Sequence, residues 1–246
     1  ASNIRLSPTQ LPKLYRHLPP ICQKLGIPEP EFYLEMNPMP NAYTYGDSRI
    51  FITITSGLVD MLDDEELDAV IAHECGHILC RHVLYHSVAV EILRGSDQLG
   101  LLGKLSLPIQ LAILHWYRMS ELSCDRCASI VTSPEVVARM MARLAGGPKV
   151  ITSELNMQEW ARQADQYEEI RNDGLWNKSL QLYVTLGLDH PFNAVRVREI
   201  LNWAQSVQYQ SLMQNLHKAI SGKKCHNCNR VVSADWTYCK YCGAKL

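Results

Sequence analysis

The spacing of apolar residues predicts that helices make up most of this chain. Residues 9–26 carry leucine, isoleucine and tyrosine three and four positions apart, which predicts one helix, kinked at Pro19-Pro20 and ended by Gly26. After Pro134 the same period returns almost without interruption and predicts helices over residues 134–145, 153–172, 175–187 and about 193–219.

Strand-like sequence is confined to one region near the N-terminus. Residues 31–35 predict a short strand, and residues 41–46 and 49–55 predict a strand pair. We therefore expect a small antiparallel sheet beside the helices, and an α+β fold class that is mostly helical.

A well-marked helix start follows the predicted strands. Asp63 or Asp64 can cap a helix whose first turn carries Glu65 and Glu66, and Asp63 and Glu66 have the spacing of a capping box. One side of this helix gathers the apolar residues Leu67, Ile71, Cys75 and Ile78. We expect that side to face the core and the opposite side to line a cleft.

The cleft side carries an H-E-x-x-H sequence that begins at His73 and ends at His77. Two histidines four positions apart project from one face of a helix, so both can bind one Zn²⁺. Glu74 then lies beside the metal, where it can take a proton from water whose pKa the metal has lowered to about 7. This pattern indicates peptide-bond hydrolysis. His82 and His86 fall about 180° from the first pair, and we expect them to be exposed or satisfied in the core.

A catalytic zinc needs a third protein ligand, which a later helix must supply. Pro108 is well placed to begin a helix that should end near Ser133-Pro134, and Glu121 on that helix is our candidate ligand. Asp125 follows on the same face, where it can accept the spare N–H of a zinc-bound histidine. The alternative is that both carboxylates are solvated helix charges, and spacing alone does not decide between the two.

This helix begins in the strongly apolar residues 99–117. The longest uncharged run there, residues 105–117, has 13 residues, against about 20 needed to span hydrocarbon. We therefore expect no membrane crossing. A buried core helix is the default interpretation, and a surface that touches a membrane or collects substrate is the alternative.

The net charge and the length of the chain exclude few classes of function. The 246 residues include 24 Lys and Arg against 25 Asp and Glu, so no strong field attracts nucleic acid or an anionic membrane. The first residues lack the features of a secretion signal, so we expect a cytoplasmic protein that is at most peripheral to a membrane.

The C-terminal end carries four of the nine cysteines in two C-x-x-C pairs, Cys225 with Cys228 and Cys239 with Cys242. Four thiolates at this spacing satisfy a tetrahedral structural Zn²⁺ and resemble a zinc ribbon. Few basic residues accompany them, so we expect the ribbon to contact protein rather than nucleic acid, with a merely stabilising cap as the alternative.

Other cysteines, namely Cys75, Cys80, Cys124 and Cys127, lie in or near the predicted catalytic helices. We interpret them as small buried hydrophobic residues, and redox control is the alternative.

Four motifs in this order resemble the peptidase family 48 zinc metallopeptidases, which include the CAAX prenyl protease and the bacterial heat-shock membrane protease. The motifs are Asn41-Ala42-Tyr43, H-E-C-G-H at residues 73–77, Glu121-x-x-x-Asp125, and His190-Pro191 with Arg196. The match covers most of residues 40–200.

The resemblance implies a complete site: zinc ligands His73, His77 and Glu121, general base Glu74, and Asp125 in support. His190 resembles the family's oxyanion-stabilising histidine, and Arg196 resembles the arginine that pairs with the aspartate. From the residues alone, a surface cation is an equal interpretation of Arg196.

Asn41, Ala42 and Tyr43 resemble the family's active-site edge strand, along which an extended peptide can add as a further strand with little sequence preference. Membrane members of the family carry spanning helices between the two zinc motifs, and residues 91–117 do not. The implied relative is a soluble or peripheral peptidase.

We therefore expect a gluzincin-type zinc endopeptidase domain over residues 1–220, with one catalytic zinc and protein or peptide substrates. Residues 221–246 are expected to form the zinc ribbon with one structural zinc. One alternative is a binding or chaperone-like protein that acts through the ribbon and the apolar residues 99–117. Another is a latent peptidase whose cleft is covered by its own helices, such as those between 150 and 188.

Overall fold

The computed structural model of the chain describes residues 3–46, 49–83, 107–172, 193–220, 224–230, 232, 237–239 and 241–246. The chain divides into two compact units, Ala1–Leu201 and Asn202–Leu246. The domain boundary expected between residues 220 and 221 stays a prediction.

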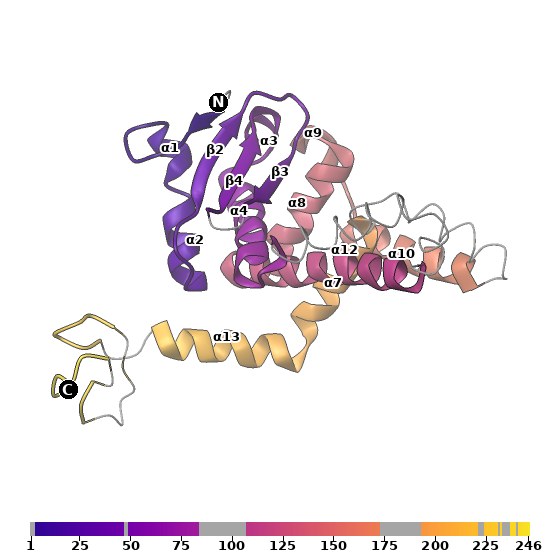
Figure 1. The fold of residues 1–246 in the computed structure, drawn as a ribbon. Helices are drawn as coiled ribbons and strands as arrows, with labels where there is room; N and C mark the ends of the chain where they lie inside the picture. Colours follow the sequence, from indigo (N-terminus) through magenta and orange to yellow (C-terminus); the bar gives the residue numbers. More distant parts are fainter. Residues whose placement is uncertain are drawn as a thin grey trace. The chain divides into compact units, whose positions relative to one another are not determined.

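The first unit contains a four-stranded sheet (Figure 1). Its order is β1 (Ile4–Arg5), β2 (Glu31–Glu35), β4 (Phe51–Thr55) and β3 (Ala42–Tyr45). The strand pair β3–β4 is antiparallel as expected, with Ala42 opposite Ile54 and Tyr45 opposite Phe51.

The prediction of a wholly antiparallel sheet is wrong, because β2 and β4 run parallel. After β2 the chain crosses to the outer strand β3 and then returns as β4 between the two. The return passes Gly46, which has φ 115° and where a Cβ atom would lie 2.0 Å from the carbonyl oxygen of Arg49. Only glycine fits this turn.

The helix predicted over residues 9–26 is two helices, α1 (Pro12–Tyr15) and α2 (Leu18–Leu25). Pro19 and Pro20 lie in the first turn of α2, where a missing N–H breaks no helical hydrogen bond, so the chain bends before them. Gly26 ends α2 in the left-handed conformation, as expected.

A short helix that the sequence did not indicate, α3 (Ser56–Met61), leads into the central helix α4 (Asp64–Leu79). The predicted capping box is confirmed, since Asp63 Oδ1 accepts from the Glu66 N–H at 2.9 Å and Glu66 Oε2 accepts from the Asp63 N–H at 3.2 Å. From Glu66 to Gly76, Asp68 is the sole residue of α4 that is not buried. We expected one side of this helix to face the core and the other to line an open cleft, but both sides are buried over most of its length.

Helix α4 is buried because it packs against α2, strand β3 and two later helices, α7 (Leu107–Val131) and α8 (Pro134–Gly146) (Figure 1). The predicted stop before Ser133-Pro134 is confirmed, and the Ser133 hydroxyl caps α8 by accepting from the Val136 N–H at 3.3 Å. Two further helices follow, α9 (Lys149–Thr152) and α10 (Met157–Asn172).

The single helix predicted over about 193–219 is two helices, α12 (Asn193–Gln205) and α13 (Val207–Ile220). Ser206 separates them, and its hydroxyl accepts from the Tyr209 N–H at 3.1 Å as a helix cap does. The helix expected over 175–187 and the apolar residues 99–106 lie outside the described residues. Within the described part of the chain, no helix combines the length and apolar character required to cross a membrane.

Candidate metal centre

Helices α4 and α7 bring three metal-binding side chains to one point. His73 Nε2 lies 3.3 Å from His77 Nε2 and 3.3 Å from a carboxylate oxygen of Glu121, and the second oxygen of Glu121 lies 3.4 Å from His77 Nε2. With metal–ligand distances of about 2.0–2.1 Å, two ligands of a tetrahedral zinc lie about 3.3–3.4 Å apart. The three donors therefore have the spacing that a zinc ion requires.

These donors are shielded from solvent. The side chain of Glu121 is 2% exposed, that of His77 is 11% exposed, and His73 is also buried. Glu121 is therefore not a solvated helix charge, which was the alternative interpretation. The Arg196 guanidinium, 3.8 Å from Glu121, offsets part of this buried negative charge, and a proton or a metal ion between the carboxylate and the imidazoles would offset more.

Asp125 orients the first histidine. Its Oδ1 lies 2.9 Å from His73 Nδ1, the nitrogen that points away from the three-donor cluster. A proton held between these atoms leaves His73 Nε2 with its lone pair free for a metal. This is the contact that the predicted supporting role of Asp125 requires, and the role itself stays a prediction.

Arg196 of α12 pairs with the same carboxylate. Its Nε donates to Asp125 Oδ2 at 2.9 Å and its Nη2 donates to Oδ1 at 2.6 Å, and both side chains are buried. This bidentate pair places Arg196 inside the molecule, so the interpretation as a surface cation is wrong. Burial opposes the charge on Asp125, but Arg196 outweighs it and lowers the pKa of that carboxyl group.

The site favours positive charge at His73. Burial alone would lower the pKa of this imidazole, but the hydrogen bond to Asp125 and the nearby Glu121 outweigh burial and raise the pKa to about 10. Carboxylates that stabilise a proton on the imidazole also stabilise a divalent cation beside it. The electrostatics of the site and the spacing of its donors thus both fit a bound divalent cation.

Gly76 allows α4 and α7 to approach closely. A Cβ atom at this position would lie 3.0 Å from Cys124 Cα and 3.2 Å from Cys124 Cβ and Sγ. Any larger residue would separate the two helices that supply the candidate metal ligands. Cys124 itself is buried, and its sulfur lies within 4.8 Å of the metal-binding nitrogens of His73 and His77.

His82 lies beside the cluster, which the sequence did not indicate. Helix α4 ends at Leu79, and Arg81 has φ 57°, so the chain turns back instead of continuing the helix. The His82 ring lies 5.3 Å from that of His77, and its Nδ1 lies 3.4 Å from Cys124 Sγ. The predicted placement of His82 on the opposite side of the helix from His73 and His77 is therefore wrong. His82 is nevertheless buried, as expected for a histidine satisfied in the core. Burial and His77 lower the pKa of His82 to about 4.

The carboxylate of Glu74 is buried on the sheet side of α4. The hydroxyl of Thr44, on strand β3, donates to Glu74 Oε2 at 2.6 Å. No sequence pattern indicates this contact, because threonine is common in strands for its β-branched shape alone.

Strand β3 includes two of the three residues predicted to form the substrate edge, Ala42 and Tyr43, and Asn41 precedes it. It is the last strand at one side of the described sheet. Asn41 is fixed to β4 by its N–H, which donates to Thr55 Oγ1 at 2.9 Å, and the Tyr43 hydroxyl donates to Glu35 at 2.8 Å. The strand is in the expected position, and its role in substrate binding stays a prediction. His190 and His86 lie outside the described residues.

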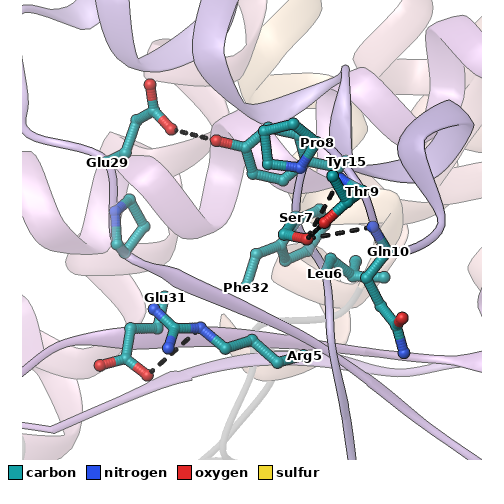
Figure 2. A pocket seen from close by; sticks show the side chains of 11 residues that line it. Arg5, Leu6, Ser7, Pro8, Thr9, Gln10, Tyr15, Glu29, Glu31 and Phe32 are labelled. Atoms are coloured by element: carbon teal, nitrogen blue, oxygen red, sulfur yellow. Dashed lines mark hydrogen bonds and ion pairs between the residues drawn. The ribbon is translucent and has the colours of Figure 1, made fainter.

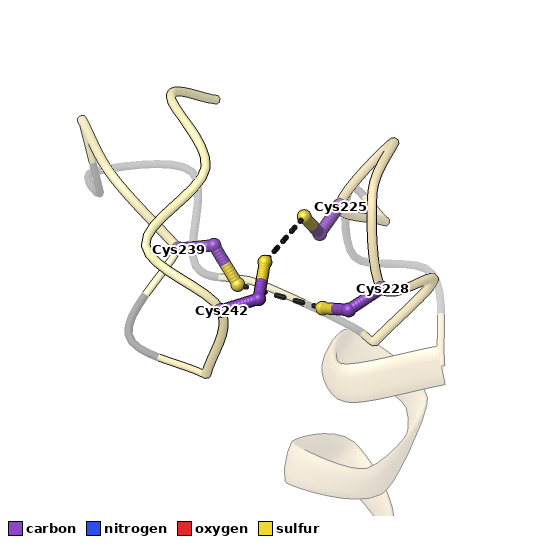
Figure 3. Close-up of side chains that lie close together, drawn as sticks. All are labelled: Cys225, Cys228, Cys239 and Cys242. Atoms are coloured by element: carbon purple, nitrogen blue, oxygen red, sulfur yellow. Dashed lines mark hydrogen bonds between the residues drawn. The ribbon is translucent and has the colours of Figure 1, made fainter.

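In the second unit, the four C-terminal cysteines converge (Figure 3). The sulfurs of Cys225 and Cys242 lie 3.6 Å apart, as do those of Cys228 and Cys239. In a tetrahedral Zn–S₄ site with bonds of about 2.3 Å, sulfurs lie about 3.8 Å apart. Hydrogen bonds from the Ala244 backbone and from Asn227 lower the pKa of Cys242 to about 6, which favours a thiolate ligand.

A separate cavity of about 670 Å³ lies where the N-terminal segment meets β2 (Figure 2). Its lining shares no residue with the three-donor cluster. The Tyr15 hydroxyl donates to Glu29 at 2.7 Å, and the Ser7 hydroxyl accepts from the Gln10 N–H at 3.0 Å. These polar groups pair with one another and fix the N-terminal segment, and they define no ligand.

A buried His-His-Glu cluster with a second carboxylate on the H-E-x-x-H helix is the arrangement of a metallopeptidase. The model of peptidase family M48 matches residues 8–204, and the chain belongs to this family. The family predicted from the order of the motifs is confirmed.

Two curated relatives are similar over much of the chain. The plastoglobule-localized metallopeptidase 48, chloroplastic, of Arabidopsis thaliana is 32% identical over 229 residues, which are 91% of this chain and 66% of the relative. A protease HtpX homolog of Trichormus variabilis is 29% identical over 185 residues, 61% of this chain and 63% of the relative. The chain thus spans less than two thirds of the length of these relatives.

The fold also resembles a solved structure. The crystal structure of S. mikatae Ste24p superposes with a TM-score of 0.51 at 16% sequence identity, over 80% of this chain and 52% of that one. At this identity the likeness concerns the fold. It agrees with a mostly helical metallopeptidase fold that has a small mixed sheet.

Proposed function

We propose that this chain is a zinc-dependent endopeptidase that hydrolyses peptide bonds in protein substrates. The observation that carries the proposal is the triangle formed by His73 Nε2, His77 Nε2 and the Glu121 carboxylate, with sides of 3.3–3.4 Å. Its spacing, burial and donor chemistry fit zinc. A zinc ion bound there would polarise the scissile carbonyl and lower the pKa of water.

The residues around the triangle have separate tasks in this proposal. His73, His77 and Glu121 hold the metal, and Asp125 keeps the proton of His73 on Nδ1, 2.9 Å away. Arg196 fixes Asp125 through two hydrogen bonds and compensates its buried charge.

Glu74 is the proposed general base. It follows His73 directly on α4 and is buried, which keeps its carboxylate largely out of bulk water. The carboxylate takes a proton from the attacking water and later gives it to the leaving amine. We propose that His190 stabilises the oxyanion, on the resemblance of its motif alone.

The substrate is proposed to be an extended segment of protein that adds to the outer edge of β3. Because such pairing uses backbone groups, cleavage would depend on exposure of an extended segment more than on its sequence. Unfolded or disordered proteins are therefore the expected substrates.

The four cysteines are proposed to hold one structural zinc, and the ribbon to serve as a contact site for a protein partner. Its small core of Cys225, Val232 and Cys239 is too limited to stabilise a fold without a metal. A cytoplasmic location, at most peripheral to a membrane, stays part of the proposal.

The substitution Glu74→Gln tests the mechanism. It removes the base and keeps the size of the side chain, so cleavage of a disordered protein such as casein should fall by about 100- to 10,000-fold. Zinc content, measured by elemental analysis, should not change. Glu65→Gln is the matched control, because Glu65 lies in the first turn of the same helix with its side chain 70% exposed.

Cleavage at the wild-type rate by a zinc-loaded Glu74→Gln chain would contradict the assigned mechanism. A wild-type chain that binds zinc and captures disordered proteins, but does not cleave them even after removal of covering segments, would instead favour the binding protein. Loss of zinc in a Glu121→Gln chain would support the ligand assignment independently of activity.

A further inference from the structure

The contact between β3 and the proposed general base is a short hydrogen bond. Thr44 Oγ1 lies 2.6 Å from Glu74 Oε2 and 3.3 Å from the backbone carbonyl oxygen of Glu74. Both partners are acceptors, so the hydroxyl is the donor and its single proton belongs to the shorter contact. A distance of 2.6 Å is typical of a hydroxyl that donates to an ionised carboxylate.

Within the part of the chain that the structure describes, Thr44 is the side-chain hydrogen-bond partner of the Glu74 carboxylate. A carboxylate without such a partner rotates about its last side-chain torsion, which has a broad energy profile. With Oε2 engaged, the plane of the carboxylate is fixed, and Oε1 is the oxygen left to face a water.

We propose that Thr44 is a positioning residue that holds the general base in its reactive orientation. The inference rests on the proposed function of Glu74 and assigns a different role to each of its two carboxylate oxygens. Oε2 stays bonded to the Thr44 hydroxyl, while Oε1 takes the proton from the attacking water and returns it to the leaving amine. Thr44 itself neither gains nor loses a proton overall.

The sheet makes Thr44 a rigid donor. Its backbone pairs with that of Ile52 in the antiparallel β3–β4 register, and a β-branched side chain has few rotamers in a strand. Thr44 is half-buried on the side that faces α4, while its neighbours Tyr43 and Tyr45 are exposed on the other face. The proposed substrate edge and the positioning group thus belong to one strand.

The substitution Thr44→Val tests the proposal, because it replaces the hydroxyl by a methyl group of similar size. We expect kcat for a peptide to fall by about 10- to 100-fold, the effect of a lost hydrogen bond to a charged group. KM should change by less than about threefold, since the hydroxyl does not contact substrate. Thr44→Ser keeps a donor and should recover most of the lost kcat.

A matched control is Thr132→Val, just beyond the end of α7. The Thr132 hydroxyl donates to the Ala128 backbone carbonyl at 2.9 Å, so the same substitution removes one hydroxyl hydrogen bond outside the proposed site. The same chemical change there should leave kcat within about twofold. Zinc content of all three variants should match the wild type, and urea unfolding should show each to be fully folded without denaturant, so that a lower kcat reports orientation and not folding.

The outcomes separate the inference from the proposed function. If Glu74→Gln abolishes cleavage while Thr44→Val keeps the wild-type kcat, Thr44 has no positioning role and the base assignment stands. If Thr44→Ser is as slow as Thr44→Val, the hydroxyl is not the cause and the inference fails. If Glu74→Gln itself retains full activity, the proposed function has failed first.

Discussion

Two carboxylates and one guanidinium surround His73 in a buried environment. Glu121 and Asp125 each lie within about 3.5 Å of a different ring nitrogen of His73, and Arg196 forms an ion pair with Asp125. The guanidinium also lies 3.8 Å from Glu121, so it offsets negative charge on both acidic groups. Each ionised side chain here is stable only because its partner is present.

Removal of Arg196 should therefore be costly. In Arg196→Met, Asp125 keeps a buried negative charge without its partner, and the free energy of unfolding should fall by about 3–5 kcal/mol. Urea unfolding of the zinc-free protein in EDTA measures this change. Arg162→Met is the control, because its pair with Glu159 is exposed on α10 and should contribute less than about 1 kcal/mol.

The loss should depend on pH in one direction. Because Arg196 lowers the pKa of Asp125 in the folded chain, the pair stabilises the fold fully above the unfolded aspartate pKa of about 3.9. Its contribution is lost as the pH falls through the lower folded pKa. The difference between wild type and Arg196→Met should thus shrink below pH of about 3.9, and a constant difference would show that lost packing dominates.

At the scale of elements, the contact of α4 with α7 depends on Gly76. Alanine is favoured over glycine inside a helix by about 1 kcal/mol, so Gly76→Ala would stabilise an isolated helix. Here the new Cβ atom meets the backbone of Cys124 at 3.0 Å, and we expect a net destabilisation of about 1–3 kcal/mol. The sign of the change in the urea midpoint shows whether helix propensity or the close contact with Cys124 dominates. A more stable Gly76→Ala variant would mean that the two helices can move apart without cost.

The N-terminus of α4 is held by two interactions of different strength. Asp63→Ala removes a cap and should cost about 1 kcal/mol. Glu66→Ala removes the other half of the capping box and also leaves the buried Arg143, whose Nε lies 3.0 Å from Glu66, without its carboxylate. We expect a loss of about 3–5 kcal/mol for Glu66→Ala in urea unfolding. Equal effects of the two substitutions would contradict a structural role for the Glu66–Arg143 pair.

Features that depend on neighbours in sequence were predictable, and features that depend on the path of the chain were not. The capping box at Asp63 and the stop before Pro134 are local, and both are confirmed. The parallel pairing of β2 with β4 requires knowledge of which strand lies between others. His82 was misplaced because the left-handed turn at Arg81 has no clear sequence signal in a non-glycine residue.

The site itself divides in the same way. The spacing of His73 and His77 defines one helix face, whereas the partnership of Glu121 with them joins residues that are far apart in the chain. Helix spacing made Glu121 and Asp125 candidates without deciding against solvated charges, and the resemblance to a family favoured them and added Arg196. That resemblance could not supply Thr44, because the contact with Glu74 is a property of this chain's sheet packed on this chain's helix.

At the scale of the whole molecule, two zinc sites would belong to two compact units, Ala1–Leu201 and Asn202–Leu246. The four-cysteine cluster has its own donors and its own small core, built on two similar turns. In each turn a C-x-x-C pair is followed by a residue in the left-handed conformation, Asn229 with φ 56° and Gly243 with φ 75°. Nothing in the donor set is shared with the His-His-Glu cluster.

This separation predicts that the two metals can be lost independently. Cys239→Ser removes one buried thiolate from the ribbon, so zinc content should fall by one ion per chain relative to wild type. Cleavage of a short peptide should keep its wild-type kcat/KM, because the substitution leaves the triangle and Glu74 unchanged. Glu121→Gln should give the reverse pattern, with the ribbon zinc retained and cleavage lost. If Cys239→Ser also abolished peptide cleavage, the ribbon would be part of the active enzyme and not an independent contact site.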